Sequence, residues 1–216
     1  MAGAVRHRGP DGAGIYASGS VGLAHTRLSI IDVACGAQPL SNEDGQVVIT
    51  YNGEVYNYLE MRAELEARGH IFATHTDTEV LVHAYEEWGD DFANHFNGQF
   101  ALAIYDRRRE RVVLVRDRFG VRPLFYAERD GNLYFASEVK ALFATGEVPA
   151  RPDLVGLDQV FTFWGARAPR TPFAGVSQLE PGTMAAWERG RLRTWRYYHL
   201  EYPEARDESP DAIRHL

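Results

Sequence analysis

The sequence predicts an α+β domain in which helices pack against antiparallel sheet. Two segments have the periodicity of amphipathic helices, whereas the apolar segments that follow them are short and bounded by turn residues. Those short segments pair around polar or Asp-Gly turns, and such hairpins join antiparallel strands. Clustered strands and helices favour the α+β class over a regular alternation. The pattern leaves open whether there is one sheet or two.

Two strands are predicted early in the chain. Apolar and polar residues partly alternate from about Val21 to Ile31, which is typical of a strand with one buried face. An apolar run from Val47 to Tyr51 follows turn residues at Asn42, Asp44 and Gly45.

Two helices come next. The first is expected from Tyr58 to Arg68, and Gly69 supplies its stop. Asn57 can cap it, with Glu60 as the acid of a capping box. The second is expected from Asp77 to Trp88, because its apolar residues recur at the i, i+3, i+4, i+7 spacing.

The next segments predict two hairpins. Apolar runs at Phe100–Tyr105 and Arg111–Val115 flank a polar stretch, which indicates a hairpin with a longer loop. The runs Leu124–Glu128 and Leu133–Ser137 flank Asp130-Gly131, a strong signal for a tight turn.

Bulk composition suits one globular domain, residues 1–200, with a charged tail at 201–216 that reads as a linker or the start of another domain. The formal net charge of -7 argues against nucleic acid or an anionic membrane as partner. We find no signal peptide and no apolar run long enough to span a bilayer, so a cytoplasmic location is expected.

Cys35 is the single cysteine, which excludes an internal disulfide. His7 and His25 lack partners at metal-ligand spacing, so no metal site is expected.

Seven short blocks stand in order along nearly the whole chain: Arg8-Gly-Pro-Asp-Gly12, His25-Thr-Arg-Leu-Ser-Ile-Ile-Asp32, Tyr51-Asn-Gly-Glu-Val-Tyr-Asn57, Thr76-Asp-Thr-Glu79, Asn97-Gly-Gln-Phe-Ala101, Arg116-Asp-Arg-Phe-Gly-Val-Arg-Pro-Leu-Phe-Tyr126 and Ser137-Glu-Val-Lys-Ala-Leu142. Together they resemble the class II glutamine amidotransferase domain, in the asparagine synthetase branch. The resemblance implies a four-layer αββα sandwich of the Ntn-hydrolase type, with two antiparallel sheets between helices.

The resemblance also implies the chemistry. The family hydrolyses the side-chain amide of L-glutamine and releases ammonia, using the thiol of an N-terminal cysteine that its own α-amino group activates. Family synthetases continue into an ATP-dependent domain that amidates aspartate. The expected cofactors are therefore ATP and Mg²⁺ for that second domain and none for this one. The expected partners are L-glutamine, the C-terminal synthetase domain of the parent protein and a second copy of the chain in a homodimer.

Arg27 and Asp77 are the candidate charges for the two ends of free glutamine. The planar fork of Arg27 matches a carboxylate, although a structural salt bridge explains a strand arginine equally well. Asp77 suits an ammonium group or a helix N-cap. Thr76 can serve as the cap instead, with Glu79 closing a capping box, and the family resemblance favours the substrate role for both candidates.

Asn52-Gly53 is by itself a turn signal. The resemblance implies that these residues form the oxyanion hole, through the Asn52 side-chain amide and the Gly53 backbone N–H. It places Glu54 beside the substrate amino group. It also implies substrate contacts for the residues that follow Arg27, namely Leu28, Ser29, Ile30 and Ile31.

The start of the chain departs from the family, which begins Met-Cys-Gly where this sequence begins Met1-Ala2-Gly3. Only five residues separate Ala2 from Arg8, so we expect the first strand, part of the first helix and the cysteine nucleophile to be missing, and glutaminase activity with them. Cys35 aligns with no catalytic position. Three interpretations stay open: a truncated glutaminase domain, a relative without glutaminase activity such as the β-lactam synthetases, and a scaffold that keeps the glutamine pocket.

Overall fold

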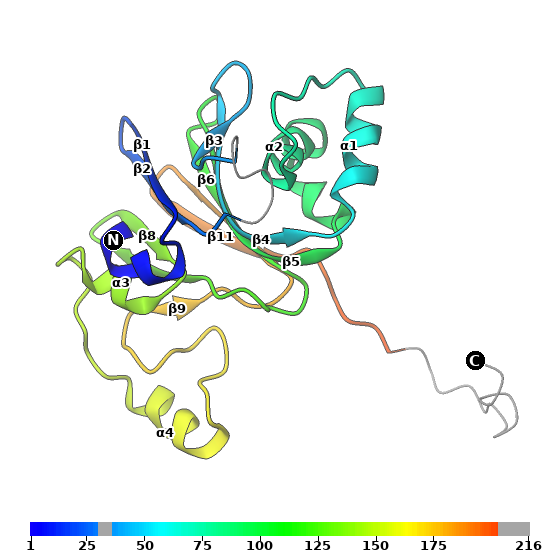
Figure 1. The fold of residues 1–216 in the computed structure, drawn as a ribbon. Coiled ribbons are helices and arrows are strands. Elements are labelled where there is room, and N and C mark those ends of the chain that lie inside the picture. The colour runs from blue at the N-terminus through cyan, green and yellow to red at the C-terminus, as the bar shows by residue number, and fades with distance from the viewer. Residues whose placement is uncertain (30–35, 203–216) are drawn as a thin grey trace, which may run out of the picture.

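The first two layers of the fold are a helical layer and a six-stranded sheet (Figure 1). The computed structural model describes residues 1–29 and 36–202. Helices α1 (Tyr58–Ala67) and α2 (Asp77–Trp88) cover one face of the sheet, whose strand order is β11-β10-β6-β5-β4-β3. All its pairings are antiparallel. The strands are β3 (Leu40–Ser41), β4 (Val47–Val55), β5 (Gly98–Asp106), β6 (Arg111–Arg116), β10 (Thr183–Glu188) and β11 (Arg191–Arg196).

The third layer lies on the other face of that sheet and consists of two pieces. One is a two-stranded hairpin and the other a three-stranded antiparallel sheet in the order β8-β7-β9. Its strands are β1 (Gly12–Ser18), β2 (Val21–Arg27), β7 (Phe125–Arg129), β8 (Asn132–Ala136) and β9 (Ser177–Gln178). The remaining helical segments are α3 (Val139–Phe143), α4 (Leu154–Phe163) and the 3₁₀ helices η1 (Ala2–Arg8) and η2 (Gly89–His95).

Three apolar clusters fill the spaces between successive layers. The largest joins α1 and α2 to the six-stranded sheet, a second lies between the two sheet layers, and a third packs α3 against β7 and β8. The order is therefore helices, sheet, sheet, helix. The αββα sandwich implied by the family resemblance is confirmed for the described residues.

Strand β4 has a different role on each face. Val47, Ile49 and Tyr51 belong to the cluster under the helices, whereas Val48 belongs to the cluster between the sheets. Side chains alternate along a strand, so Asn52 and the other even-numbered residues of β4 face the space between the sheets. This alternation directs the polar end of β4 into the interior of the sandwich.

Several element predictions are confirmed. Helix α2 has the predicted bounds, and β5 pairs with β6 as the first predicted hairpin. Strands β7 and β8 form the second, whose turn residues Asp130 and Gly131 have φ of 49° and 75°. Positive φ at both positions matches the twist of a two-residue hairpin, which explains the Asp-Gly signal.

Other element predictions were wrong in part. The first strand is β1, whose Gly- and Ala-rich sequence gave no apolar signal, and β2 ends at Arg27. The predicted continuation through Ile30 and Ile31 lies outside the described residues. Strand β4 is longer than predicted because it continues to Val55 through Asn52-Gly53, so that dipeptide forms no turn.

The predicted cap of α1 was also wrong. Asn57 makes no side-chain cap hydrogen bond. Its amide instead donates to the carbonyl of His95 at 2.9 Å and accepts from the N–H of Asn97 at 2.9 Å. A long-range contact between the start of α1 and the start of β5 therefore replaces the local capping box. Within the described ranges, no helix combines the length and apolarity needed to cross a bilayer.

Candidate functional site

A cavity of about 740 Å³ lies between the two sheet layers. Residues of β4 and β5 line one side of it, residues of β2 and β8 line the other, and the first turn of α2 lies at one end. The sequence candidates that line it are Arg27, Leu28, Asn52, Gly53, Glu54 and Asp77. Ser29 lies with Arg27 at a second, smaller cavity. Ile30 and Ile31 lie outside the described residues.

Asn52 presents an amide donor with no protein acceptor. Its Nδ2 atom is buried and has no hydrogen-bond partner among the described residues. A buried donor without a partner costs about 1–3 kcal/mol, so proteins rarely keep one unless another molecule satisfies it. The side chain therefore has the position and the unused donor expected of a ligand-binding group.

The backbone N–H of Gly53 points to the outer edge of β4. Tyr51 N–H donates to Gln38 Oε1 at 2.7 Å, and Val55 N–H donates to Asp77 Oδ2 at 3.2 Å, both away from β5. N–H groups two residues apart in a strand point the same way, so that of Gly53 faces the edge occupied by Asp77. Two donors from consecutive residues thus border the cavity.

Glycine is required at position 53 by the neighbouring strand. A Cβ atom there would lie 2.1 Å from the carbonyl oxygen of Gln99 and 2.6 Å from Cα of Phe100. Both contacts are with backbone of β5, which cannot move aside without breaking the sheet. The Asn-Gly pair thus marks the place where the backbones of β4 and β5 approach each other closely.

Asp77 does not cap α2. The cap is Thr76, whose Oγ1 accepts from the N–H of Glu79 at 3.2 Å, and this decides between the two candidate caps that the sequence left open. The Glu79 carboxylate does not complete the capping box, because it accepts instead from the N–H groups of Ala73 at 2.8 Å and Thr74 at 2.7 Å. The carboxylate of Asp77 consequently points to β4 and the cavity.

The surroundings of Asp77 hold its carboxyl in place. Tyr51 Oη donates to Asp77 Oδ2 at 2.7 Å, in addition to the bond from Val55 N–H. Burial raises the pKa of Asp77, and these two hydrogen bonds oppose that rise. Burial and the nearby Asp77 charge raise the pKa of Tyr51 well above its ordinary value, so its hydroxyl stays a donor.

Tyr51 and Arg122 are cavity residues to which sequence reasoning gave no role. Both lie in the quoted sequence blocks, which was the only signal available for them. The Nε atom of Arg122 is buried without a hydrogen-bond partner among the described residues. Its positive charge lies close enough to lower the pKa of Tyr51, against the rise caused by burial. Arg122 is therefore a second cation beside the cavity.

His25 lines the cavity as a neutral imidazole. Its Nδ1 lies 3.3 Å from Oγ1 of Thr50, and burial, followed by the charge of Arg27, lowers its pKa from 6.5 to about 4. The unfolded chain therefore binds a proton at His25 between pH 6.5 and 4 that the folded chain does not. Stability from this group is present above pH 6.5 and is lost as the pH falls through that window.

We expect the melting temperature to fall between pH 6.5 and 4 and the fall to be smaller in His25→Gln, which keeps a polar side chain without the titration. Thermal unfolding at half-unit pH steps measures both proteins. His199→Gln is the matched control, because His199 is an exposed histidine that lies beyond β11 and does not line the cavity. Equal pH profiles for the wild type and His25→Gln would contradict the account.

Comparisons with known proteins agree with this geometry. A family model described as a glutamine amidotransferase domain matches residues 1–198. Asparagine synthetase [glutamine-hydrolyzing] 3 of Bacillus subtilis is 36% identical, over all of this chain and 36% of that protein. Asparagine synthetase B of Escherichia coli is 47% identical, over 64% of this chain and 25% of that protein. The chain thus spans about a third or less of these relatives.

A solved structure shows the same fold. The glutamine phosphoribosylpyrophosphate amidotransferase of B. subtilis has a TM-score of 0.64 at 21% identity, over 92% of this chain and 45% of that one. This likeness agrees with the sandwich of two antiparallel sheets between helices. On the family model and the relatives, the chain belongs to the class II glutamine amidotransferase domains of the asparagine synthetase branch.

Proposed function

We propose that the cavity binds L-glutamine and aligns its side-chain amide for hydrolysis to glutamate and ammonia. The observation that supports this most directly is the unpartnered Nδ2 of Asn52 beside the N–H of Gly53. The two donors would bind the amide oxygen and the negative charge that develops on it. Loss of one such donor typically slows acyl transfer by about 10²–10³-fold.

The charged groups around the cavity match the other end of the substrate. Asp77, together with the exposed Glu54, supplies negative charge for the α-ammonium group. Arg27 supplies a planar cation for the α-carboxylate, and Leu28 lies beside it. We keep Ser29, Ile30 and Ile31 in the proposed substrate site on the family resemblance. Free glutamine needs one charge of each sign at its backbone end, so this arrangement favours it over a peptide-bound glutamine.

Glutamine titration tests the proposal. We expect saturable binding to the wild type and roughly ten- to hundred-fold weaker binding to Asp77→Asn, because a charged hydrogen bond contributes about 1.5–3 kcal/mol. Calorimetry measures both constants. Asp91→Asn is the matched control, since it removes one exposed carboxylate on η2. Equal affinities for the wild type and Asp77→Asn would contradict the substrate role, as would wild-type protein that binds no glutamine at millimolar concentration.

Hydrolysis needs a nucleophile as well as these donors. In the family this is the thiol of an N-terminal cysteine, and the printed sequence has one cysteine, Cys35, which lies outside the described residues. We therefore expect the 216-residue chain to bind glutamine without releasing ammonia. A coupled ammonia assay measures this. Turnover above background that survives Cys35→Ser would contradict it, and turnover that Cys35→Ser abolishes would identify Cys35 as the nucleophile.

We further propose that ammonia from this domain serves a C-terminal synthetase domain that uses ATP and Mg²⁺ to amidate aspartate. The support is that the matched relatives are asparagine synthetases whose length extends well beyond this chain. An apolar surface at α4 supports contact with such a domain or with a second subunit of a homodimer. There, Phe161 is 84% exposed and Trp164 96% exposed, which is costly in water unless a partner covers them.

A further inference from the structure

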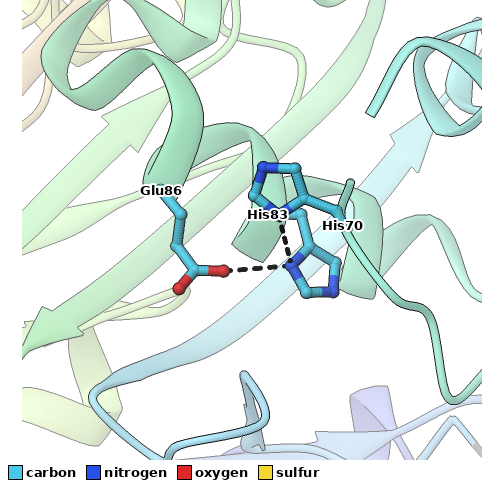
Figure 2. A group of neighbouring side chains, drawn as sticks. All are labelled: His70, His83 and Glu86. Carbon is cyan, nitrogen blue, oxygen red and sulfur yellow. Dashed lines mark hydrogen bonds and ion pairs between the residues drawn. The ribbon is translucent and has the colours of Figure 1, made fainter. Parts of the chain in front are cut away.

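A cluster of two imidazoles and a carboxylate lies on the helical layer, apart from the glutamine cavity (Figure 2). His70 comes from the segment between α1 and α2, whereas His83 and Glu86 lie one turn apart on α2. Nδ1 of His83 is 3.2 Å from Nδ1 of His70 and 3.0 Å from Oε2 of Glu86. Tetrahedral bonds of about 2.0–2.1 Å to one ion would place ligand atoms about 3.3 Å apart. The spacing is that of a coordination shell.

Two of the three side chains, His70 and Glu86, are hydrogen-bonded to an outer polar group. Nε2 of His70 lies 3.4 Å from Oε2 of Glu87, and Oε1 of Glu86 accepts from Asn42 Nδ2 at 2.6 Å. Nε2 of His83 is buried and has no hydrogen-bond partner among the described residues, although Oε1 of Glu79 lies 3.9 Å away. A carboxylate hydrogen-bonded to the outer nitrogen of a histidine, as Glu87 is to His70, is the arrangement that orients histidines at metal sites.

The three ligand atoms that face one another are Nδ1 of His70, Nδ1 of His83 and Oε2 of Glu86. Glu87 favours the His70 tautomer with the proton on Nε2, which leaves Nδ1 of His70 as a lone-pair acceptor facing Nδ1 of His83. Two acceptors, Nδ1 of His70 and Oε2 of Glu86, then approach Nδ1 of His83, which carries at most one proton. Without a cation among the three atoms, Nδ1 of His70 and the Glu86 carboxylate repel each other, because one proton on Nδ1 of His83 can be directed at only one of them. The complete burial of His83, at 0% exposure, prevents water from screening the repulsion.

We propose that His70, His83 and Glu86 bind a divalent transition-metal ion of the Zn²⁺ class. Imidazole and carboxylate ligands together suit zinc, which accepts three protein ligands and one water. The side chains of His70 and Glu86 are each 17% exposed, so the fourth position has access to solvent. The ion would fix the segment after α1 to α2, whose first turn holds Thr76 and Asp77 at the glutamine cavity.

Zinc titration of the full chain, free of purification tags and treated with a chelator, tests the site. We expect one saturable site by calorimetry and a raised melting temperature, because the ion binds the folded state. His70→Gln and Glu86→Gln should abolish both effects, and both positions are exposed enough to tolerate the change. Glu87→Gln should weaken binding about 10- to 100-fold, the usual effect of losing an outer-shell partner.

The control is His75→Gln, an exposed histidine in the same segment as His70, which should leave the zinc affinity unchanged. The site is contradicted if the wild type binds no zinc at a twofold excess over micromolar protein. It is also contradicted if His70→Gln binds as tightly as the wild type. In either case a proton shared by His83 and Glu86 would account for the short distances.

Discussion

Replacing Asp117 with Ala is expected to lower the free energy of unfolding by about 3 kcal/mol or more, since each unsatisfied buried donor costs about 1–3 kcal/mol. The Asp117 carboxylate is 0% exposed. It accepts hydrogen bonds from the backbone N–H groups of Phe100 at 3.2 Å and of Phe119, Val121 and Arg122 at 3.0 Å each. It therefore holds the loop that positions Arg122 beside the cavity. Urea unfolding of both proteins measures the difference.

Two further variants sharpen this prediction. Asp117→Asn keeps one acceptor oxygen and should have intermediate stability. Asp158→Ala removes an exposed carboxylate of α4 and should change stability by less than about 0.5 kcal/mol, as for most surface substitutions. An Asp117→Ala protein as stable as Asp158→Ala would show that the loop satisfies its N–H groups without the carboxylate.

Gly53→Ala is expected to cost about 3 kcal/mol or more and to abolish glutamine binding. The added methyl group would overlap backbone of β5, with the Gln99 oxygen at 2.1 Å, so β4 and β5 must separate. Overpacking alone costs about 1–3 kcal/mol, and strained backbone adds to it. Separation of the strands would also move the N–H of Gly53 and the amide of Asn52. Chemical denaturation and glutamine calorimetry measure the two effects.

Gly131→Ala is the matched control for Gly53→Ala. Gly131 also has positive φ, of 75°, but a Cβ atom there meets nothing within 4 Å. Gly131→Ala should therefore lose only about 1–2 kcal/mol of stability, the usual cost of a left-handed backbone conformation for a residue with a side chain, and should bind glutamine normally. If Gly53→Ala behaved like Gly131→Ala, the close approach of β4 and β5 would not be what requires glycine.

The sequence predicted those elements whose signals are local. The i, i+3, i+4, i+7 spacing predicted α2, and Thr76 could be named as one of two candidate caps, beside Asp77, because a capping side chain acts within one turn. Asp130-Gly131 identified the turn between β7 and β8. The quoted blocks supplied six candidates that line the cavity, but they did so through family resemblance, since Asn52-Gly53 by itself predicted a turn.

The features that the sequence could not predict depend on contacts between distant segments. Asn57 bonds to His95 and Asn97, about forty residues away, in place of its own helix. His70 and His83 are thirteen residues apart, which is not a recognisable metal-binding spacing. They meet only because the segment between the helices folds back on α2. Arg122 gave no signal of its own, because the loop held by Asp117 decides where it points.

A crystal structure of the chain grown with L-glutamine tests the glutamine site most directly. We expect the ligand in the cavity between the sheets, with its side-chain oxygen about 3 Å from Nδ2 of Asn52 and the N–H of Gly53. Its ammonium group should contact Asp77, and its carboxylate Arg27. Glutamine bound elsewhere, or bound in the reverse direction with its amide at Asp77, would contradict the proposed site. So would a cavity without glutamine at a saturating concentration.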